Sequence, residues 1–309
     1  MKRVAVTGGT GFIGAALIDQ LLADGGRVRA LARDPRRLKR AGDIETIEGD
    51  LENSRALEAL ADGADVFLHL AGETHARTEQ DYARINVAGA ERAAAAAAKA
   101  GARFVHASSL SARSPDTSPY ARSKHDSESA VARATDGAFL ALRLPAIYGP
   151  GDLVTLPYFK LLKSGFAFEP ATERPARASL LYVDDAAGAL IAAATRGAPG
   201  AVYEVGDEAP DGRTWSEIGK ALSSVFGNSA MALRIPKPAV ALLHEGVRAA
   251  ESVFGKTPSI RQGQVNELFH PDWVARENLF SAAADWRPRT PLKEGFAKTV
   301  LWYQEQGLL

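Results

Sequence analysis

The 309-residue chain contains no cysteine, which excludes disulfides, thiol catalysis and thiolate metal sites. It also lacks an excess of either charge, because Lys and Arg together number 37 and so do Asp and Glu. Composition therefore gives no electrostatic reason to expect a nucleic-acid partner. No set of His, Asp and Glu has the spacing of metal ligands, and we expect no metal.

Long apolar runs are missing as well. No run reaches the ~18 residues of a membrane span, and the nearest candidate, residues 238–254, is interrupted by Glu245. The first residues lead directly into a strand-like pattern, so we see no secretory signal. These absences predict a cytoplasmic protein without a membrane-spanning segment, long enough for one large domain or two smaller ones.

Among the features that are present, the glycine-rich stretch over residues 4–14 is the most informative. Alternating apolar residues predict a short buried strand, and the apolar period after Gly14 predicts a helix. A strand, a glycine turn and a helix form the context in which such glycines bind a dinucleotide. We expect Gly8 to allow a sharp turn, Gly11 to let a pyrophosphate approach, and Gly14 to let helix and strand lie close together. The alternative is a tight turn without a ligand.

Short strand-like segments alternate with helical ones through the first half of the chain. Strands are expected over residues 4–7, 27–32, 45–50, 65–70, 103–107 and 138–143, and the clearest helices over residues 79–100 and 119–135. The alanines of residues 93–98 favour a closely packed helix. This alternation predicts a Rossmann-type α/β fold with a doubly wound parallel sheet.

Ligands of such a sheet lie beyond the carboxyl ends of its strands. Several residues far apart in the sequence fall at or beyond these ends: Gly14, Arg33, Asp50, Ala71 and Ser109. We expect them to converge on one crevice at the edge of the sheet.

The pattern changes at residues 148–152, after which segments are shorter and richer in Pro and Gly. A further strand is expected over residues 179–185, followed by helices over residues 186–195, 215–226, 238–254 and 291–306. We predict a dinucleotide-binding domain over residues 1–150 and a smaller C-terminal substrate lobe over residues 151–309. Residues 178–205 are expected to return to the first domain.

These motifs resemble those of the short-chain dehydrogenases/reductases, in the extended or atypical branch with the NAD-dependent epimerase/dehydratase fold. The matching pieces occur in family order at residues 7–14, 49–51, 69–72, 86–87, 108–109, 120–124, 142–150 and 182–185. The resemblance covers residues 4–185. The rest, with Trp273, Trp286 and Trp302, is more loosely similar to the tails of sugar-nucleotide epimerases and of hydroxysteroid or flavonol-type reductases.

Tyr120 and Lys124 are four residues apart on a predicted helix, so their side chains share a face. A free tyrosine titrates near ~10 and is a poor base at neutral pH, and a nearby ammonium should lower its pKa. The resemblance implies that Tyr120 is the acid/base, Lys124 holds the ribose and the tyrosine, and Ser109 orients the substrate. It also implies a supporting role for Asn86. The alternative is an ordinary amphipathic helix.

The segment between Ser109 and Tyr120 departs from the family pattern. Only eleven positions separate the two residues, whereas many sugar-nucleotide members carry a longer insert. A large sugar nucleotide is therefore a less favoured substrate. Ser108 or Ser111 could also supply the working hydroxyl.

The tip of the second strand decides the cofactor, because an acidic residue there suits NAD and a basic one suits the 2′-phosphate of NADP. Arg33 stands at this tip with Arg36 and Arg37 behind it, and a guanidinium matches a phosphate. NADP(H) is favoured, but NAD(H) stays open because Asp34 could neutralise Arg33 or take the NAD role. The resemblance implies further cofactor contacts at Gly8, Thr10, Gly11, Phe12, Ile13, Gly14, Asp50, Leu51, Leu70, Ala71, Gly72, Tyr120, Lys124, Pro145 and Ile147.

Other polar residues are open to two interpretations. The family lines its substrate pocket where His75 and Tyr148 lie, and His75 is expected at the rim. Asp50 could flank the adenine with Leu51, or merely end its strand. His69 and His106 are expected in the core, and we read residues 184–185 as a helix start at which one carboxylate caps N–H groups.

Together these observations favour an NAD(P)-dependent oxidoreductase that transfers hydride between nicotinamide and a carbonyl or alcohol, using Tyr120, Lys124 and Ser109. Its substrate would be a small-molecule carbonyl or alcohol. A nucleotide-sugar epimerase is the alternative, and a non-catalytic NADP(H)-binding regulator or assembly protein is a further one. The family resemblance also suggests a homodimer formed through the helices over residues 79–100 and 119–135.

Overall fold

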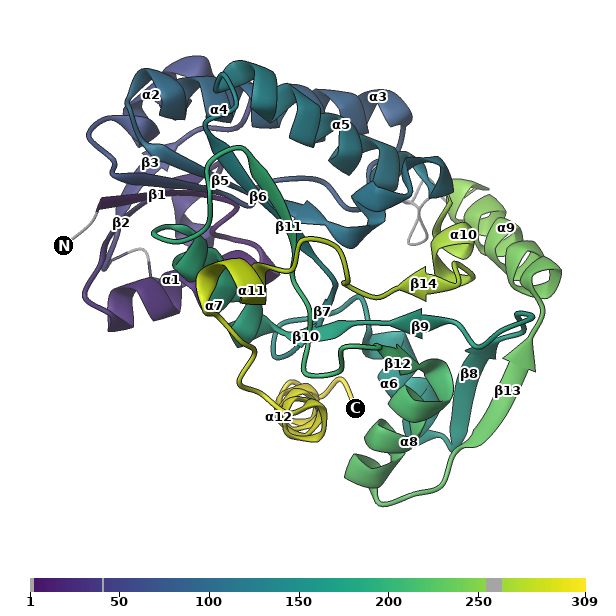
Figure 1. Cartoon of the computed structure of the whole chain (residues 1–309). Helices are drawn as coiled ribbons and strands as arrows, with labels where there is room; N and C mark the ends of the chain where they lie inside the picture. The colour runs from purple at the N-terminus through teal and green to yellow at the C-terminus, as the bar shows by residue number, and fades with distance from the viewer. Residues whose placement is uncertain (1–2, 41, 254–262) are drawn as a thin grey trace.

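The computed structural model describes residues 3–40, 42–253 and 263–309, and of residues 248 and 250–253 only the backbone. Seven parallel strands form the main sheet in the order β11-β6-β5-β4-β1-β2-β3 (Figure 1). Their bounds are β1 (Arg3–Thr7), β2 (Arg27–Ala32), β3 (Glu45–Glu48), β4 (Val66–His69), β5 (Arg103–Ser109), β6 (Phe139–Leu144) and β11 (Ala201–Glu204). The predicted parallel sheet is confirmed.

Helices cover both faces of this sheet, so it is doubly wound as expected (Figure 1). One face packs against α1 (Phe12–Ala23) and α7 (Val183–Ala193), and the other against α2 (Ser54–Ala61), α4 (Ala88–Lys99) and α5 (Pro119–Ala134). The strands alternate between the two cores: Val4 and Val6 belong to the first and Ala5 to the second. Burial on both faces is why these strands are apolar almost throughout.

The long helix expected over residues 79–100 is interrupted. It comprises α3 (Glu79–Tyr82), a π-helical turn (Ala83–Val87) and α4. The wider turn holds the buried Asn86, whose side chain bonds to the loop after β4. The alanines pack as predicted, since Ala93 and Ala97 are fully buried.

The remaining elements form smaller sheets and helices below the main sheet (Figure 1). They are β7 (Ala146–Tyr148), α6 (Leu156–Lys163), β8 (Phe166–Pro170), β9 (Arg177–Ala178), β10 (Leu180–Tyr182), β12 (Arg213–Thr214), α8 (Trp215–Phe226), β13 (Met231–Ile235), α9 (Lys237–Val253), α10 (Gln264–Leu268), β14 (Asp272–Trp273), α11 (Phe280–Ala284) and α12 (Leu292–Glu305). In their core, Phe159 packs edge-on against both Phe296 and Tyr303. The expected end of α9 at residue 254 lies outside the described residues, and the domain division at residue 150 stays a prediction.

One boundary in this half differs from the expected one. The strand predicted over residues 179–185 ends at Tyr182, and α7 begins at Val183. Asp184 and Asp185 therefore lie in the first turn, where the helix dipole favours negative charge. The predicted capping is wrong for Asp185, because its carboxylate accepts hydrogen bonds from the N–H groups of Arg289 and Thr290 instead.

Helix length and polarity also bear on membranes. In the part of the chain that the structure describes, no helix combines the length and the apolar character that a membrane crossing needs.

Candidate active site

The glycine turn between β1 and α1 has the conformation that its sequence predicts. Gly8 has a φ of +78°, and a Cβ atom there would lie 2.6 Å from the amide nitrogen of Ala71. A Cβ atom on Gly14 would lie 2.1 Å from the carbonyl oxygen of Gly8. Gly8 thus serves both the turn and a close approach to the chain leaving β4, and Gly14 allows helix and strand to touch.

The N-terminus of α1 is open to an acceptor. Gly11 is its N-cap residue, and no side chain of the described residues caps it. The first N–H groups of a helix lack partners within the helix and carry a partial positive charge. Together with the glycine turn, this end of α1 fits the pyrophosphate of a dinucleotide.

The strand ends around this turn are held together by Thr7. Its hydroxyl lies 2.8 Å from Nδ1 of His69 and accepts a hydrogen bond from the N–H of Ala71 at 3.3 Å. Both His69 and His106 are buried in the core as predicted, and burial lowers the pKa of each imidazole, that of His69 to about 3. Leu70 and Ala71 are half-buried beside the turn and Gly72 is exposed.

The adenine side is less sharply defined. The Asp50 carboxylate accepts hydrogen bonds from the N–H groups of Glu52 and Asn53 at 2.9 and 3.1 Å. Asp50 therefore organises the turn after β3, and its expected place beside the adenine stays a prediction. Leu51 is buried against Gly89 of α4.

At the tip of β2, the carboxylate of Asp34 is engaged within its own loop. It accepts two hydrogen bonds from the Arg36 side chain, at 2.9 and 3.1 Å, and one from its backbone N–H. The Arg36 guanidinium lowers the pKa of Asp34. Arg33 is exposed and forms no ion pair with any described residue. Asp34 thus does not neutralise Arg33.

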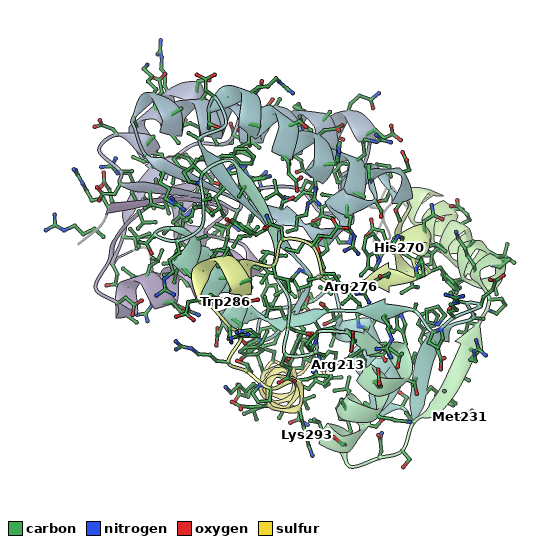
Figure 2. The ribbon with its side chains drawn as sticks, viewed as in Figure 1. Arg213, Met231, His270, Arg276, Trp286 and Lys293 are labelled. Carbon is green, nitrogen blue, oxygen red and sulfur yellow. The ribbon has the colours of Figure 1, made fainter. Side chains whose placement is uncertain are left out.

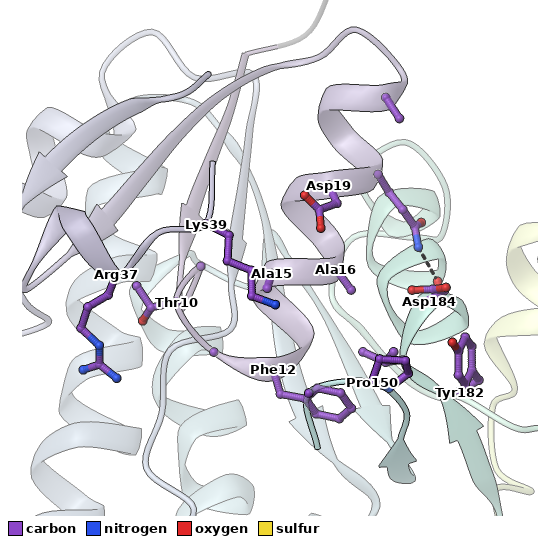
Figure 3. A pocket seen from close by; sticks show the side chains of 16 residues that line it. Thr10, Phe12, Ala15, Ala16, Asp19, Arg37, Lys39, Pro150, Tyr182 and Asp184 are labelled. Atoms are coloured by element: carbon purple, nitrogen blue, oxygen red, sulfur yellow. Dashed lines mark hydrogen bonds between the residues drawn. The ribbon is translucent and has the colours of Figure 1, made fainter. Parts of the chain in front are cut away.

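A cavity of about 600 Å³ runs along the outer side of α1 (Figure 3). Arg37 lies beside Thr10 at one end, and Tyr182 and Asp184 lie at the other. Its wall includes Gly11 and Phe12 of the glycine turn, but the candidate serine, tyrosine and lysine lie elsewhere. Sequence reasoning named Arg37 only as support for Arg33, and missed Lys39 in the same wall.

Two of the candidate catalytic residues, Tyr120 and Lys124, lie on the first turns of α5. Ser118 caps this helix by accepting a hydrogen bond from the N–H of Ala121 at 3.0 Å. Tyr120 is half-buried, and its ring packs edge-on against Tyr82 at 6.2 Å. Lys124, one turn on, is 9% exposed and donates a 2.6 Å hydrogen bond to the carbonyl oxygen of Ala107. Burial lowers the pKa of Lys124 to about 8, although the nearby Glu128 carboxylate opposes the shift.

The three serines near the end of β5 have different surroundings. Ser108 is buried and donates a 2.5 Å hydrogen bond to Glu128, which also forms a salt bridge with Arg143. Ser111 is buried and donates to the hydroxyl oxygen of Ser109 at 2.9 Å. Ser109 is partly exposed and accepts bonds from both the hydroxyl and the N–H of Ser111. Its own hydroxyl proton therefore remains for a substrate oxygen.

Asn86 connects two of these segments. Its amide exchanges hydrogen bonds with the backbone N–H and carbonyl of Glu73, at 2.7 and 3.0 Å, and donates to the Ser123 hydroxyl at 2.9 Å. Ser123 in turn donates to the carbonyl oxygen of Tyr120. Asn86 thereby holds the loop after β4 against the helix that bears Tyr120.

The other residues expected in the pocket are spread more widely. His75 is half-buried in the loop after β4. Pro145 is buried and Ile147 packs between the main core and that of the smaller elements. Tyr148 is 2% exposed, with its ring 4.9 Å from that of Phe296. Its expected place in the substrate pocket stays a prediction, because the buried ring also borders a small cavity that is lined in part by charged side chains.

Two contacts near the catalytic helix escaped the sequence argument. Arg113, four residues after Ser109, forms an ion pair with the buried Glu204 at 3.3 Å and donates to the carbonyl oxygens of Asp272 and Val274. Glu204 also accepts the backbone N–H of Arg276, which lies between the sheet and the smaller lobe (Figure 2). The Ser118 hydroxyl bonds to the carboxylate of Glu267 in α10. No local pattern signals these pairs, because only the fold brings their members together.

Known proteins match the chain along most or all of its length. A model of the NAD dependent epimerase/dehydratase family matches residues 4–206. A ceramide reductase of Caulobacter vibrioides is 41% identical over 99% of this chain and 96% of its own. A 3 beta-hydroxysteroid dehydrogenase/Delta 5-->4-isomerase of Mycobacterium tuberculosis is 29% identical over 92% of this chain and 84% of its own.

Among solved structures, a UDP-glucose 4-epimerase of Thermotoga maritima has a similar fold. It superimposes with a TM-score of 0.73 over 98% of this chain and 99% of its own, at 20% identity. The family model spans the glycine turn and all seven strands of the main sheet, from β1 to β11. The chain therefore belongs to the NAD-dependent epimerase/dehydratase family of extended short-chain dehydrogenases/reductases, and is an NAD(P)-dependent enzyme of the oxidoreductase or epimerase type.

Proposed function

We propose that this enzyme is an NADPH-dependent ketoreductase whose substrate is a ceramide-type lipid with a ketone on its long-chain base. The observation that carries the proposal is the 41% identity, over 99% of the chain, with a protein named ceramide reductase. Residues 1–150 would hold the cofactor, and residues 151–309 would close the substrate side. A homodimer through α4 and α5 stays a prediction.

The proposed chemistry is the reduction of a ketone to an alcohol. When bound, the nicotinamide supplies the hydride that the carbonyl carbon receives. Ser109 donates a hydrogen bond to the carbonyl oxygen, which pulls electron density away from the carbon. Tyr120 gives its phenolic proton to the same oxygen, so that the product is a neutral alcohol.

Lys124 has two duties in this scheme. Its ammonium, now bonded to the carbonyl oxygen of Ala107 at 2.6 Å, has donors left for the ribose hydroxyls. Its positive charge also favours the tyrosinate that remains after proton transfer. Asn86 keeps Tyr120 in place through Ser123.

Preference for NADPH rests on the charges around the tip of β2. Arg33 is exposed and unneutralised by Asp34, and Arg37 reaches the end of the cavity at Thr10 (Figure 3). A 2′-phosphate placed between these guanidinium groups and the N-terminus of α1 would make charge-assisted hydrogen bonds. Asp34, the carboxylate next to Arg33 at this tip, already accepts three hydrogen bonds from Arg36, which weakens it as an acceptor for the 2′-hydroxyl of NADH.

The test is a pair of turnover assays with purified protein. We expect NADPH to be oxidised when a ketone-bearing ceramide is supplied in mixed micelles, and UDP-glucose not to be converted to UDP-galactose. The same ceramide with a hydroxyl instead of the ketone is the matched control and should give no oxidation. Conversion of the sugar nucleotide without any lipid reduction would replace the proposal by the epimerase alternative.

A further inference from the structure

The helix α9 exposes an apolar stripe on its outer face. Leu242 and Leu243 are 78% and 66% exposed, and Ala239 and Gly246 are exposed on the same side. These positions follow the spacing of one helix face. The opposite face points inward, where Val240 is buried and Val247 half-buried. The helix is therefore apolar toward the protein and apolar toward its surroundings.

The helix that carries this stripe is connected to the candidate active site through α10. α9 packs against α10 at the edge of the smaller elements, near the start of α5 (Figure 1). α10 bonds directly to the residues that precede the catalytic tyrosine, since Glu267 accepts from the Ser118 hydroxyl and Asn266 donates to the carbonyl oxygen of Thr117 at 3.2 Å. A molecule that covers the outer face of α9 would thus be separated from the segment before Tyr120 by α10 alone.

We propose that the outer face of α9 inserts into the surface of a lipid bilayer, so that the candidate active site opens toward the membrane that holds its substrate. The proposal rests on the proposed function for the substrate class. A lipid with long acyl chains is almost insoluble in water, and an enzyme that acts on it must collect it from a membrane. The two exposed leucines of α9, the helix that packs against α10, give the contact that this transfer needs.

The size of the stripe argues against a second copy of the chain as its occupant. A stable protein interface buries about 800 Å² on each partner. Two leucines flanked by alanine and glycine cannot supply such an area from apolar side chains alone. They can supply a reversible anchor, because each buried leucine strengthens membrane binding by about tenfold or more.

The charges of α9 point to apolar insertion rather than to electrostatic attraction. In sequence the helix carries Lys237, Glu245, Arg248 and Glu251, which balance. Binding that depends on a polybasic segment falls steeply with salt. Insertion of Leu242 and Leu243 should instead persist at high ionic strength.

The absence of cysteine allows a direct test. The single-cysteine variant Leu242→Cys, labelled with the polarity-sensitive fluorophore NBD, is mixed with vesicles of phosphatidylcholine and phosphatidylglycerol. Leu301→Cys is the matched control, since Leu301 is 56% exposed on α12. We expect the label at position 242 to brighten and shift to the blue with vesicles, in low and high salt, and the label at position 301 to remain unchanged.

A second experiment links the surface to turnover. The double variant Leu242→Ser/Leu243→Ser should bind vesicles at least about 100-fold more weakly and reduce vesicle-borne ketone correspondingly more slowly. The double variant should reduce a short-chain, water-soluble ketone analogue at the wild-type rate. The control variant Leu301→Ser should also reduce this analogue at the wild-type rate.

Three outcomes decide between the readings. A label at position 242 that stays in water with vesicles overturns the proposal. So does a label that responds to protein concentration without vesicles, because that indicates self-association. Insertion of the label without reduction of any ketone supports the membrane contact and rejects the proposed substrate.

Discussion

The cofactor side and the substrate side of the site are built in different ways. On the cofactor side, Gly8 and Gly14 shape the backbone within a few residues of each other. On the substrate side, Arg113 reaches Glu204, 91 positions away, and Ser118 reaches Glu267, 149 positions away. A motif therefore reveals the first side, because its geometry is local. The second side depends on pairs that only the folded chain defines.

The largest effect should come from Tyr120→Phe, which tests whether catalysis can be lost on the substrate side while cofactor binding stays intact. The variant removes the only proton that Tyr120 can give and leaves the glycine turn intact. We expect kcat to fall about 10³-fold with the ketone substrate, while NADPH affinity, measured by fluorescence titration, stays at the wild-type value. A parallel loss of NADPH affinity would mean that the tyrosine hydroxyl is also needed for cofactor binding. The cofactor side and the substrate side would then not be independent.

Arg113→Met tests the substrate side, which depends on contacts between residues distant in sequence. Its removal leaves the Glu204 carboxylate, 2% exposed, without its cationic partner. We expect the free energy of unfolding to fall by about 3 kcal/mol in urea titrations, because an uncompensated buried charge is costly. The KM for the ketone should rise more than kcat falls, since the loop after Ser109 loses its attachment.

The matched control is the double variant Arg113→Met/Glu204→Gln. Because both charges are gone, its stability should exceed the value that the two single variants predict by addition. Strict additivity would show that the ion pair does not couple the two segments. The backbone bonds from Arg276 and Glu277 to Glu204 would then have to hold the loop.

A smaller effect is expected on the cofactor side from Arg37→Ala. Loss of one charge-assisted contact to the 2′-phosphate should weaken NADPH binding about 10–100-fold. NADH binding should not change. Arg40→Ala is the control, because Arg40 lies in the same segment but is paired with Asp19 at 3.0 Å. Equal losses for both cofactors would assign Arg37 to the fold of the loop instead.

The extent of prediction from sequence follows the same division. The glycine turn, the parallel sheet and the burial of His69 follow from local pattern, and the structure has them. The near-complete burial of Tyr148 escaped prediction, because its motif says where the residue lies along the chain but not that Phe296 packs on its ring. In the sequence, the exposed leucines of α9 cannot be told from core residues, because the apolar pattern of a helix does not show whether a given face is buried or exposed.

The smallest effect is expected on the free energy of unfolding, from removal of the buried amine of Lys124. In the proposed scheme this amine serves both the cofactor and Tyr120. Its pKa is lowered from 10.5 to about 8, so below pH 8 the folded protein holds a charge that burial disfavours. Such a shift corresponds to about 3 kcal/mol, partly offset by the lost bond to Ala107 in a Lys124→Met variant. We expect that variant to be inactive yet more stable by about 1–2 kcal/mol at pH 7.

The pH dependence of stability tests this cause. Between pH 8 and 10.5 the unfolded wild type binds more protons than the folded one, so the free energy of unfolding of the wild type rises with pH and approaches that of the variant. Urea titrations of both proteins at pH 7 and 9.5 measure this difference. A gap that does not narrow at the higher pH would show that the ammonium is not the source of the cost, and that Lys124 is held in the fold by packing alone.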